Sequence, residues 1–468
     1  MSDNKQIVVI GGGITGLTAA YYLQEEIQKK QLPYEVKLIE ASGRLGGKIM
    51  SYQKDGFTIE RGPDSFLIRK KSAAELVKDV GLEDELIKNG TGQSYILVND
   101  QLHKMPSGSF MGVPTQVKPF LQSSLFSWKG KLRAGFDFVL PKGKAQPDQS
   151  LGLFFRRRLG DEIVENLIEP LLSGIYAGDI DDLSLMSTFP NFYDLEQEHQ
   201  SLVKGLQKTV PKPPKSNRKQ KKPSMFYSLK NGLESLVHAV EAKLEDGTVW
   251  KETEVTEIKR RDSKYDILLG NQETMEADAV VMATPYFATA HMLRDYPFVE
   301  PLHQMKATSV ANVALAFDAS AIQKDIDGTG FVVSRNSSYR ITACTWVHKK
   351  WPTSTPKGKV LLRCFVGKPD DQQVIDLSDK EIVEIALQDI KKIMNITGEP
   401  DFSVVTRWKQ AMPQYSVGHK LRISSVREGM KQELPGLFLA GSSYEGIGIP
   451  DCIDQGKAAV EQVLTFLN

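Results

Sequence analysis

The sequence is poor in the residues that build metal centres and disulfide frameworks. Its 468 residues include three cysteines, Cys344, Cys364 and Cys452, which form no CxxC pair. The seven histidines are scattered, with no HExxH motif and no other metal-ligand spacing. We therefore expect neither a metal site nor a fold that is held together by disulfide bonds.

The sequence also lacks a charge excess and a long apolar run. Its 59 basic and 58 acidic residues give a net charge of +1, which does not suggest nucleic acid binding. No stretch of roughly 18 uncharged apolar residues is present, so we expect no transmembrane segment. The first expected strand begins within about seven residues of Met1 and leaves no room for a signal peptide. We expect a reduced, cytoplasmic protein.

The most informative stretch is residues 7–40. An apolar run at 7–10 predicts a strand, and a helix is expected at 17–28, followed by a second strand at 35–39. Between the first strand and the helix, Gly11 permits a tight turn, Gly13 lets the backbone approach a pyrophosphate, and Gly16 allows close helix packing. Glu40 ends the second strand, where it can accept hydrogen bonds from ribose hydroxyls. This pattern indicates dinucleotide binding at Gly11, Gly12, Gly13, Ile14, Thr15, Gly16 and Glu40.

The next residues, 41–48, favour a flavin over a nicotinamide. They read ASGRLGGK and match the GRxGG extension of flavoproteins related to amine oxidases, phytoene desaturases and GDP-dissociation inhibitors. Arg44 can meet a phosphate as a planar, always-charged fork. Gly46 and Gly47 allow the backbone to lie against the cofactor.

A second set of flavin motifs lies near the other end of the chain. Residues 436–441 read as a strand that feeds a turn at Gly441, and EGIGIP at 445–450 precedes a helix expected from about Asp451 to Phe466. The N-terminus of that helix would favour negative charge on a flavin. Motifs at both ends predict a discontinuous cofactor domain, and the chain is too long for one core.

The basic run at 69–71 is a candidate carboxylate site. Ser72 and Glu75 form a capping-box pattern, which predicts a helix that ends near Gly81. Lys71 would stand beside the N-terminus of this helix, where an anion is favoured. A solvated turn is an equally good interpretation of the three bases.

The middle of the chain carries weaker patterns. Residues 95–106 predict a β-hairpin, and 150–172 predict helix followed by a small-residue loop, 172–178, in which Gly174 lets backbone approach a flat ligand. Residues 107–140 mix apolar and basic side chains, which suits either a membrane face or an ordinary helical lobe. Residues 207–224 are basic and proline-rich, and predict a disordered loop.

Taken together, these motifs resemble the bacterial coproporphyrinogen and protoporphyrinogen oxidase family. The likeness rests on the flavin motifs at both ends, ERGPDSF at 60–66, LLSGIYAGDIDDLSLMSTFP at 171–190 and GIGIPDCIDQGKAAV at 446–460. It covers essentially the whole chain except the 207–224 insert. The soluble Gram-positive type, which acts on coproporphyrinogen III, is the most similar.

The resemblance implies an α/β fold with α+β insertions: a Rossmann-like FAD-binding domain, an inserted mixed-sheet substrate domain and a helical lobe. The expected FAD-binding domain comprises 1–56, 225–290 and 431–468, the substrate domain 57–106 and 291–430, and the lobe 107–206. Implied cofactor contacts, with the glycine turn and Arg44, are Glu40, Ala41, Lys48, Gly62, Pro63, Asp64, Ser65, Val255, Trp408, Gly441, Ile447, Gly448 and Ile449. Implied substrate contacts are Lys71, Gly174 and Ile175.

The implied reaction is oxidation of coproporphyrinogen III to coproporphyrin III in haem biosynthesis, by hydride transfer to FAD, with three O2 reduced to three H2O2. No acid pair or Ser/His/Asp set is identified, so we name no side-chain catalyst. Protoporphyrinogen IX remains a second possible substrate. An amine oxidase, a carotenoid desaturase and a non-catalytic inhibitor-type protein on the same fold are further hypotheses for the function. Expected partners are porphyrinogen and O2, with peripheral membrane contact and transient contact with downstream haem enzymes left open.

Overall fold

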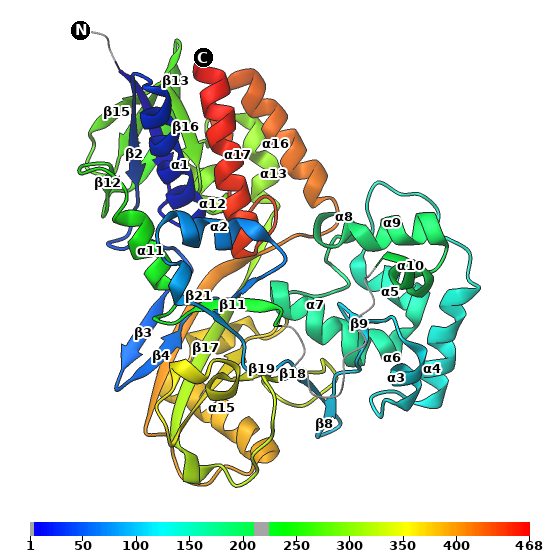
Figure 1. Cartoon of the computed structure of the whole chain (residues 1–468). Coiled ribbons are helices and arrows are strands. Elements are labelled where there is room, and N and C mark those ends of the chain that lie inside the picture. Colours follow the sequence, from blue (N-terminus) through cyan, green and yellow to red (C-terminus); the bar gives the residue numbers. More distant parts are fainter. Residues whose placement is uncertain (1–3, 210–223) are drawn as a thin grey trace.

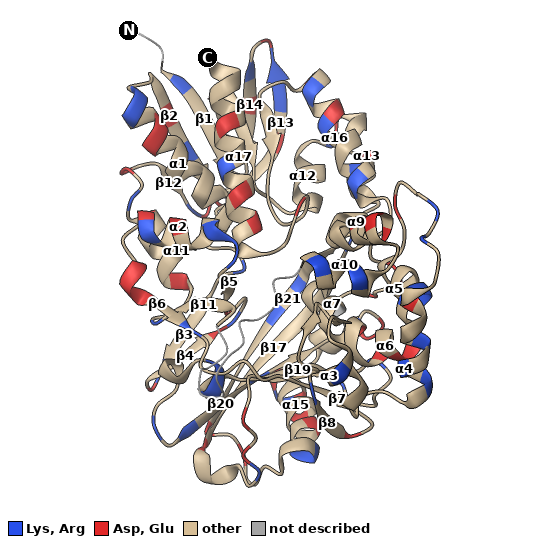
Figure 2. Cartoon of the chain, turned by 45° about the vertical axis from the view of Figure 1, so that its right-hand side comes forward, with Lys and Arg blue, Asp and Glu red and all other residues tan. Residues whose placement is uncertain are grey.

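The computed structural model describes residues 4–209 and 224–468, which form three packed parts (Figure 1). A nucleotide-binding part contains both ends of the described chain, a seven-stranded sheet lies below it, and a helical lobe stands to one side (Figures 1 and 2). This arrangement confirms the expected α/β class with α+β insertions.

The centre of the nucleotide-binding part is a parallel five-stranded sheet in the order β12-β2-β1-β16-β22. Its strands are β1 (Lys5–Ile10), β2 (Tyr34–Ile39), β12 (Val249–Trp250), β16 (Ala279–Met282) and β22 (Leu437–Leu439). Ile7 pairs with Val36 on one side and with Ala279 on the other. The strand interior is fully buried, as expected for a parallel sheet covered on both faces.

Helices from the two ends of the sequence cover one face of this sheet. Helix α1 (Ile14–Lys30) packs beside α17 (Ile449–Leu467), and α11 (Glu234–Glu241) and α2 (Lys71–Asp79) complete the layer (Figure 1). Gly456 of α17 lies so close to α1 that a Cβ there would come within 2.7 Å of the Thr15 carbonyl oxygen. The two cofactor motifs, which are far apart in sequence, therefore meet in one layer.

The opposite face of the sheet is covered by a small antiparallel sheet and three helices. These elements are β13 (Val255–Arg261), β14 (Lys264–Leu269), β15 (Thr274–Ala277), α12 (Tyr286–Met292), α13 (Glu300–His303) and α16 (His419–Glu433). Leu302 and Val426 belong to the same buried cluster as Val8 and Val280. Parts of 291–305 and 419–430 thus pack on the nucleotide-binding sheet, whereas the expected boundaries at 290 and 430 assigned them to the substrate domain.

The seven-stranded sheet has the order β21-β17-β20-β19-β18-β7-β8. Its strands are β7 (Tyr95–Val98), β8 (Gln101–Lys104), β17 (Lys306–Asp318), β18 (Gly330–Val333), β19 (Ile341–Trp346), β20 (Lys359–Val366) and β21 (Phe402–Gln414). All neighbours are antiparallel except β18 and β7, and α15 (Asp379–Met394) packs on one face. The expected hairpin at 95–106 is present as β7 and β8.

Two small sheets lie between this sheet and the nucleotide-binding part. The hairpin of β3 (Ser51–Lys54) and β4 (Phe57–Glu60) packs against β17 and β20. A three-stranded sheet joins β5 (Phe66–Leu67), β11 (Phe226–Leu229) and β6 (Leu86–Lys88). Residues 60–65 therefore pass between the two larger sheets.

The helical lobe is built around its own apolar core. Its helices are α3 (Val117–Gln122), α4 (Trp128–Gly135), α5 (Leu151–Leu159), α6 (Asp161–Ile163), α7 (Glu169–Tyr176), α8 (Leu185–Thr188), α9 (Pro190–His199) and α10 (Leu202–Thr209), with β9 (Ser109–Phe110) pairing β10 (Val113–Pro114). The region predicted as one helix at 150–172 is interrupted at Gly160, whose φ is +87°, and contains a π-helical turn at Val164–Ile168. The helix α10 also includes 207–209, so the expected loop does not begin at 207; residues 210–223 lie outside the described part.

None of the helices in the described ranges, 4–209 and 224–468, is long and apolar enough to cross a membrane.

Candidate active site at the junction of the three parts

The glycine turn is shaped to receive a phosphate group. Gly11 has φ +103°, and a Cβ on Gly16 would lie 1.9 Å from the Gly11 carbonyl oxygen, so both positions require glycine. Gly13 is the N-cap of α1 and contributes no side-chain cap, while a Cβ there would meet nothing within 4 Å. The first turn of α1 therefore faces open space, as an anion site needs.

Glu40 stands next to this turn, as predicted. One carboxylate oxygen accepts a 2.7 Å hydrogen bond from the Gly12 N–H, and the other accepts from the backbone and hydroxyl of Ser42. The Thr253 N–H donates to the Glu40 carbonyl, which brings the start of β13, and thus Val255, beside the acid. Glu40 and the start of β13, where the implied cofactor contact Val255 lies, are therefore close together.

Arg44 differs from its predicted role as an open phosphate fork. Its guanidinium donates to the carbonyls of Leu45, Gly47 and Ile49, within its own loop. A Glu234 carboxylate oxygen lies 3.7 Å away, and partial burial lowers the pKa of Arg44. The observed contacts make Arg44 a support of the Gly46-Gly47 bend, and a phosphate contact remains a prediction.

Lys48 links the two ends of the cofactor motif. Its ammonium donates to the Ser442 hydroxyl at 3.3 Å, and burial lowers its pKa. Gly441, with φ +120°, lies beside Thr15, because a Cβ there would be 3.7 Å from the Thr15 hydroxyl. The N-terminal glycine turn and the turn after β22 thus form one cradle.

Side chains from the seven-stranded sheet hold the carbonyl groups of residues 60–62. Trp408 donates to the Arg61 carbonyl at 2.8 Å, Asn312 donates to the same oxygen at 3.1 Å, and Arg363 donates to the Glu60 carbonyl at 3.1 Å. A Cβ on Gly62 would lie 1.9 Å from the Lys48 carbonyl oxygen. The stretch that leads into the implied cofactor contacts at Gly62–Ser65 is therefore fixed from both sides.

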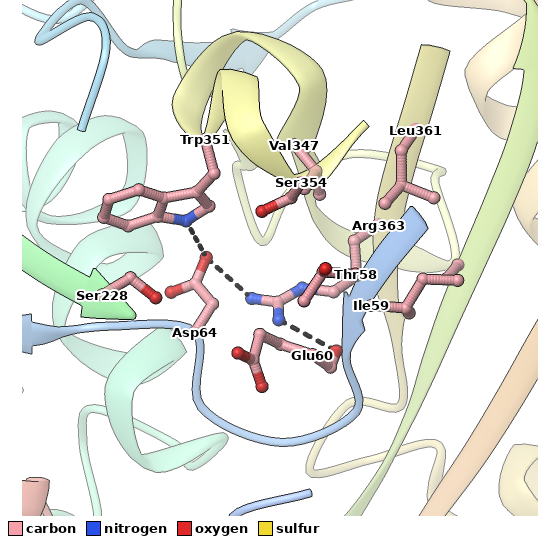
Figure 3. Close-up of a pocket in the computed structure, with 11 residues that line it drawn as sticks. Thr58, Ile59, Glu60, Asp64, Ser228, Val347, Trp351, Ser354, Leu361 and Arg363 are labelled. Carbon is pink, nitrogen blue, oxygen red and sulfur yellow. Dashed lines mark hydrogen bonds and ion pairs between the residues drawn. The ribbon is translucent and has the colours of Figure 1, made fainter. Parts of the chain in front are cut away.

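The Asp64 side chain points into a buried charge cluster, shown in Figure 3. One carboxylate oxygen accepts from Lys350 at 2.8 Å, and lies 3.1 Å from Arg363 and 3.3 Å from the Trp351 indole nitrogen. Burial alone would raise the pKa of Asp64, but Lys350 and Arg363 more than offset it and hold the pKa below its usual range. These contacts hold the Asp64 side chain within the protein, and its contact with a cofactor remains a prediction.

Glu60 is a second acid in the same cluster (Figure 3), and its pKa is shifted in the opposite direction from that of Asp64. Its carboxyl oxygens accept from the Leu233 N–H at 2.7 Å and the Ser51 hydroxyl at 2.8 Å. Burial raises the pKa of Glu60 to about 7, against the lowering effect of these hydrogen bonds and of Arg363. Glu60 and Asp64 line a cavity of about 10 Å³, room for about one water molecule.

The helix α17 begins at the cradle. Gly448 is its N-cap, with no side-chain cap, Ile449 is the first helical residue and Pro450 the second. Ile447 packs against the apolar core of the helical lobe. The predicted Ile447–Ile449 segment therefore joins the cofactor cradle to the lobe.

The predicted substrate residues lie on two helices that border this junction. Lys71 is exposed and is the first residue of α2, but the expected capping box is wrong: Ser72 donates instead to the Pro450 carbonyl at 3.1 Å. Gly174 and Ile175 lie in α7, which continues to Tyr176, and not in a loop, because the apolar residues Leu172 and Tyr176 extend the buried helical face. Both positions are exposed, and a Cβ on Gly174 would meet nothing within 4 Å.

Residues 14–464 match the family model described as flavin containing amine oxidoreductase. The chain belongs to this family. It is 56% identical to the coproporphyrinogen III oxidase of Bacillus subtilis (strain 168), over 100% of both chains. It is 44% identical to the coproporphyrinogen III oxidase of Staphylococcus aureus, over 99% of this chain and 100% of the relative. The resemblance inferred from the motifs is confirmed.

Solved structures give the same fold. A putative protoporphyrinogen oxidase from Exiguobacterium sp. 255-15 superposes with a TM-score of 0.86 at 39% identity, over 98% of both chains. Cyclohexylamine oxidase from Brevibacterium oxydans superposes with a TM-score of 0.70 at 15% identity, over 99% of both chains, which supports the fold alone.

The residues present fit FAD, and the protein is an FAD-dependent oxidoreductase. The open space at Gly13 suits the pyrophosphate, Glu40 suits a ribose, and the half-buried Lys48 ammonium lies between the two motifs. The sequence interpretation did not identify Asn312 or Arg363, which fix the backbone of 60–62. Both are buried polar residues inside apolar strands, and that pattern was the available signal.

Proposed function

We propose that this protein oxidises coproporphyrinogen III to coproporphyrin III. Six electrons and six protons leave the macrocycle, and three O2 molecules take them up as three H2O2. The observation that carries the proposal is the 56% identity, over the whole length, to a protein named coproporphyrinogen III oxidase. FAD, when bound, supplies the electron acceptor and passes the electrons to O2.

The residues of the chain supply binding and orientation. The substrate is a large, mostly apolar macrocycle with four carboxylates on its rim, so it needs an apolar slot with basic groups at the edge. Lys71 offers an exposed ammonium at the first turn of α2, where the helix dipole also favours an anion. On α7, Gly174 leaves room for a flat ligand and Ile175 offers apolar contact, since its exposed fraction is 39%.

The second candidate substrate is protoporphyrinogen IX, which carries two carboxylates. It is favoured by the name of the 39% identical Exiguobacterium protein and by the protoporphyrinogen oxidase 1 of spinach chloroplasts, which is 28% identical over 98% of this chain and 84% of the relative. The 56% and 44% identical proteins carry the coproporphyrinogen name, and we therefore prefer the tetracarboxylate.

We further propose that the enzyme works in the reducing cytoplasm and touches a membrane surface peripherally. The helix α4 and the turn after it expose Trp128, Leu132, Phe136 and Val139, with fractions between 49% and 73%. Lys118, Lys129 and Lys142, in the same stretch of the chain, are exposed as well. Such a combination suits a surface of anionic lipid.

The deciding experiment compares kcat/KM for the two porphyrinogens on the purified, flavin-loaded enzyme, with H2O2 measured alongside. We expect a higher value for coproporphyrinogen III and one H2O2 for each pair of electrons. A clear preference for protoporphyrinogen IX would overturn the substrate assignment. A flavin-free protein that oxidises neither compound would overturn the proposed function as a whole.

A further inference from the structure

The three consecutive bases at the start of α2 are not equivalent in the structure. Lys70, the N-cap residue, forms an ion pair with Asp451 in the first turn of α17. Arg69 and Lys71 are exposed, and within residues 4–209 and 224–468 neither forms an ion pair. One of three cations is therefore already neutralised.

Two further contacts join α2 to α17 along the same line. The buried Ser72 hydroxyl donates to the Pro450 carbonyl at 3.1 Å, and the Glu75 carboxylate lies 3.4 Å from the Lys457 ammonium. The signs alternate, positive then negative on α2 and negative then positive on α17. This seam therefore pairs opposite charges at two points where α2 lies beside α17.

Asp451 also shapes the loop that precedes its own helix. A Cβ on Gly446 would lie 2.7 Å from the Asp451 Cβ, and a Cβ on Gly448 would lie 2.7 Å from a carboxylate oxygen of Asp451. The Asp451 carboxylate acts on Tyr176 as well, since burial first and this negative charge second raise the pKa of Tyr176. Asp451 thus stands where α2, α7 and the 446–448 loop meet.

The Lys70–Asp451 pair has a physical reason in the positive charge at the N-terminus of α2. Three adjacent cations there repel one another and the positive end of the helix dipole. Asp451 relieves part of that repulsion and is itself favoured at the N-terminus of α17. A surface ion pair adds little stability, and both side chains are about one third exposed, at 34% and 30%. We therefore expect this pair to affect the position of α2 more than the stability of the protein.

We propose that Lys70 and Asp451 form a positioning pair for substrate recognition. The pair holds the first turn of α2 against α17, so that Lys71 faces the substrate side of the junction while the 446–448 loop keeps its shape. The inference rests on the proposed function and adds to it a specificity-determining contact that does not touch the substrate. The pair acts through Lys71 and is not itself catalytic.

The test measures KM and kcat for coproporphyrinogen III with flavin-loaded Asp451→Asn, Lys70→Met, the double variant and Lys70→Arg. We expect Asp451→Asn and Lys70→Met each to raise KM about tenfold with a smaller change in kcat. The double variant should raise KM no more than either single variant does. The variant Lys70→Arg, which keeps the charge, should stay within about twofold of the wild type. Glu75→Gln is the matched control, since it breaks the more exposed ion pair of the same seam and should leave KM unchanged.

Several outcomes would overturn the positioning pair. One is an unchanged KM in Asp451→Asn and Lys70→Met. Another is a lower KM in Asp451→Asn, which would mean that the released Lys70 binds substrate directly. Additive effects in the double variant would also contradict it. Titration of each variant with the product coproporphyrin, followed by flavin fluorescence, gives a binding readout without turnover. If the wild type oxidises neither porphyrinogen, the proposed function fails, and the product titration alone then decides whether the pair affects binding.

Discussion

The indole N–H of Trp408 donates a 2.8 Å hydrogen bond to the carbonyl oxygen of Arg61. This bond joins β21 of the seven-stranded sheet to residues 60–62, which lie beside the cofactor cradle. Since this stretch is also fixed by Asn312 and Arg363, we expect Trp408→Phe to fold. Loss of the hydrogen bond should lower the unfolding free energy by about 1 kcal/mol and weaken FAD binding several-fold. Thermal unfolding and flavin-release titration measure the two effects. Trp250→Phe is the control, because that indole donates to the nearby Gly247 carbonyl at 3.2 Å and lies outside residues 60–62. An equal loss of FAD affinity in both variants would contradict the role of Trp408.

Two glycines of the same turn should respond differently to alanine. In Gly16→Ala the new Cβ would clash with the Gly11 carbonyl oxygen at 1.9 Å, so we expect destabilisation of the apoprotein by roughly 2–4 kcal/mol. In Gly13→Ala the Cβ enters open space, and the apoprotein should keep its melting temperature while its FAD affinity falls at least tenfold. Calorimetry of the apoproteins measures the effect on stability, and flavin titration measures the effect on FAD affinity. Equal FAD affinity of Gly13→Ala and the wild type would show that the open space is not the pyrophosphate site.

Glu60 predicts a pH dependence of stability. Burial raises its pKa to about 7 from the ordinary 4.5, so the folded protein binds this proton more tightly than the unfolded chain does. The stabilisation is fully present below pH 4.5 and is lost as the pH rises through 7, by up to about 3 kcal/mol. Glu60→Gln keeps an acceptor for the Leu233 N–H and cannot ionise, and should therefore be more stable than the wild type at pH 8 but not at pH 5. Denaturant unfolding at both values checks this, and parallel pH curves would refute it.

Lys71 should determine how well the carboxylate rim is bound. We expect Lys71→Glu to raise the KM for coproporphyrinogen III about tenfold, and to raise that for protoporphyrinogen IX less, because the latter has fewer carboxylates. Steady-state kinetics on both substrates measure the difference. Lys78→Glu, in the last turn of the same helix, controls for the change in net charge. Equal effects of the two variants would remove Lys71 from the substrate site.

The exposed apolar face of the lobe should bind anionic vesicles. We expect the wild type to co-sediment with phosphatidylglycerol vesicles at low salt and much less with phosphatidylcholine vesicles. Replacing Trp128 and Leu132 together by alanine should abolish this binding, since both are about 70% exposed. Phe287→Ala removes an exposed aromatic side chain from α12 and serves as the control. Binding that persists in the double variant would exclude this face.

Local patterns predicted the cofactor half of the molecule well. The strand, glycine turn and acid at 7–40 depend on neighbouring residues, and the structure places Gly11, Gly13, Gly16 and Glu40 together as expected. The prediction of FAD is likewise confirmed by the family. Short-range backbone geometry dominates in such a turn, so the sequence alone suffices.

The errors arose where distant contacts decide. Ser72 had the spacing of a capping residue, but its hydroxyl bonds to Pro450 instead. Gly174 was predicted to lie in a loop, but the helix α7 continues beyond it to Tyr176 because its apolar face is buried. Arg363 could not be assigned, because its partners lie about 300 positions earlier in the chain. A polar residue inside an apolar strand can be noticed locally, but its partners across such separations cannot be read from the sequence, and tertiary packing overrides propensity there.

The strand order of the five-stranded sheet has a kinetic consequence. Strand β1 is made first, but its partner β16 ends at Met282 and the edge strand β22 ends at Leu439. At about 5–20 residues per second, synthesis reaches β16 only after roughly 15–55 seconds and β22 after roughly 20–90 seconds. The apolar run Ile7–Ile10 can pair early with β2, but its other neighbour, β16, is made only after the first of these delays. The nascent chain therefore depends on chaperone cover, or on delayed folding, more than its ordinary composition would suggest.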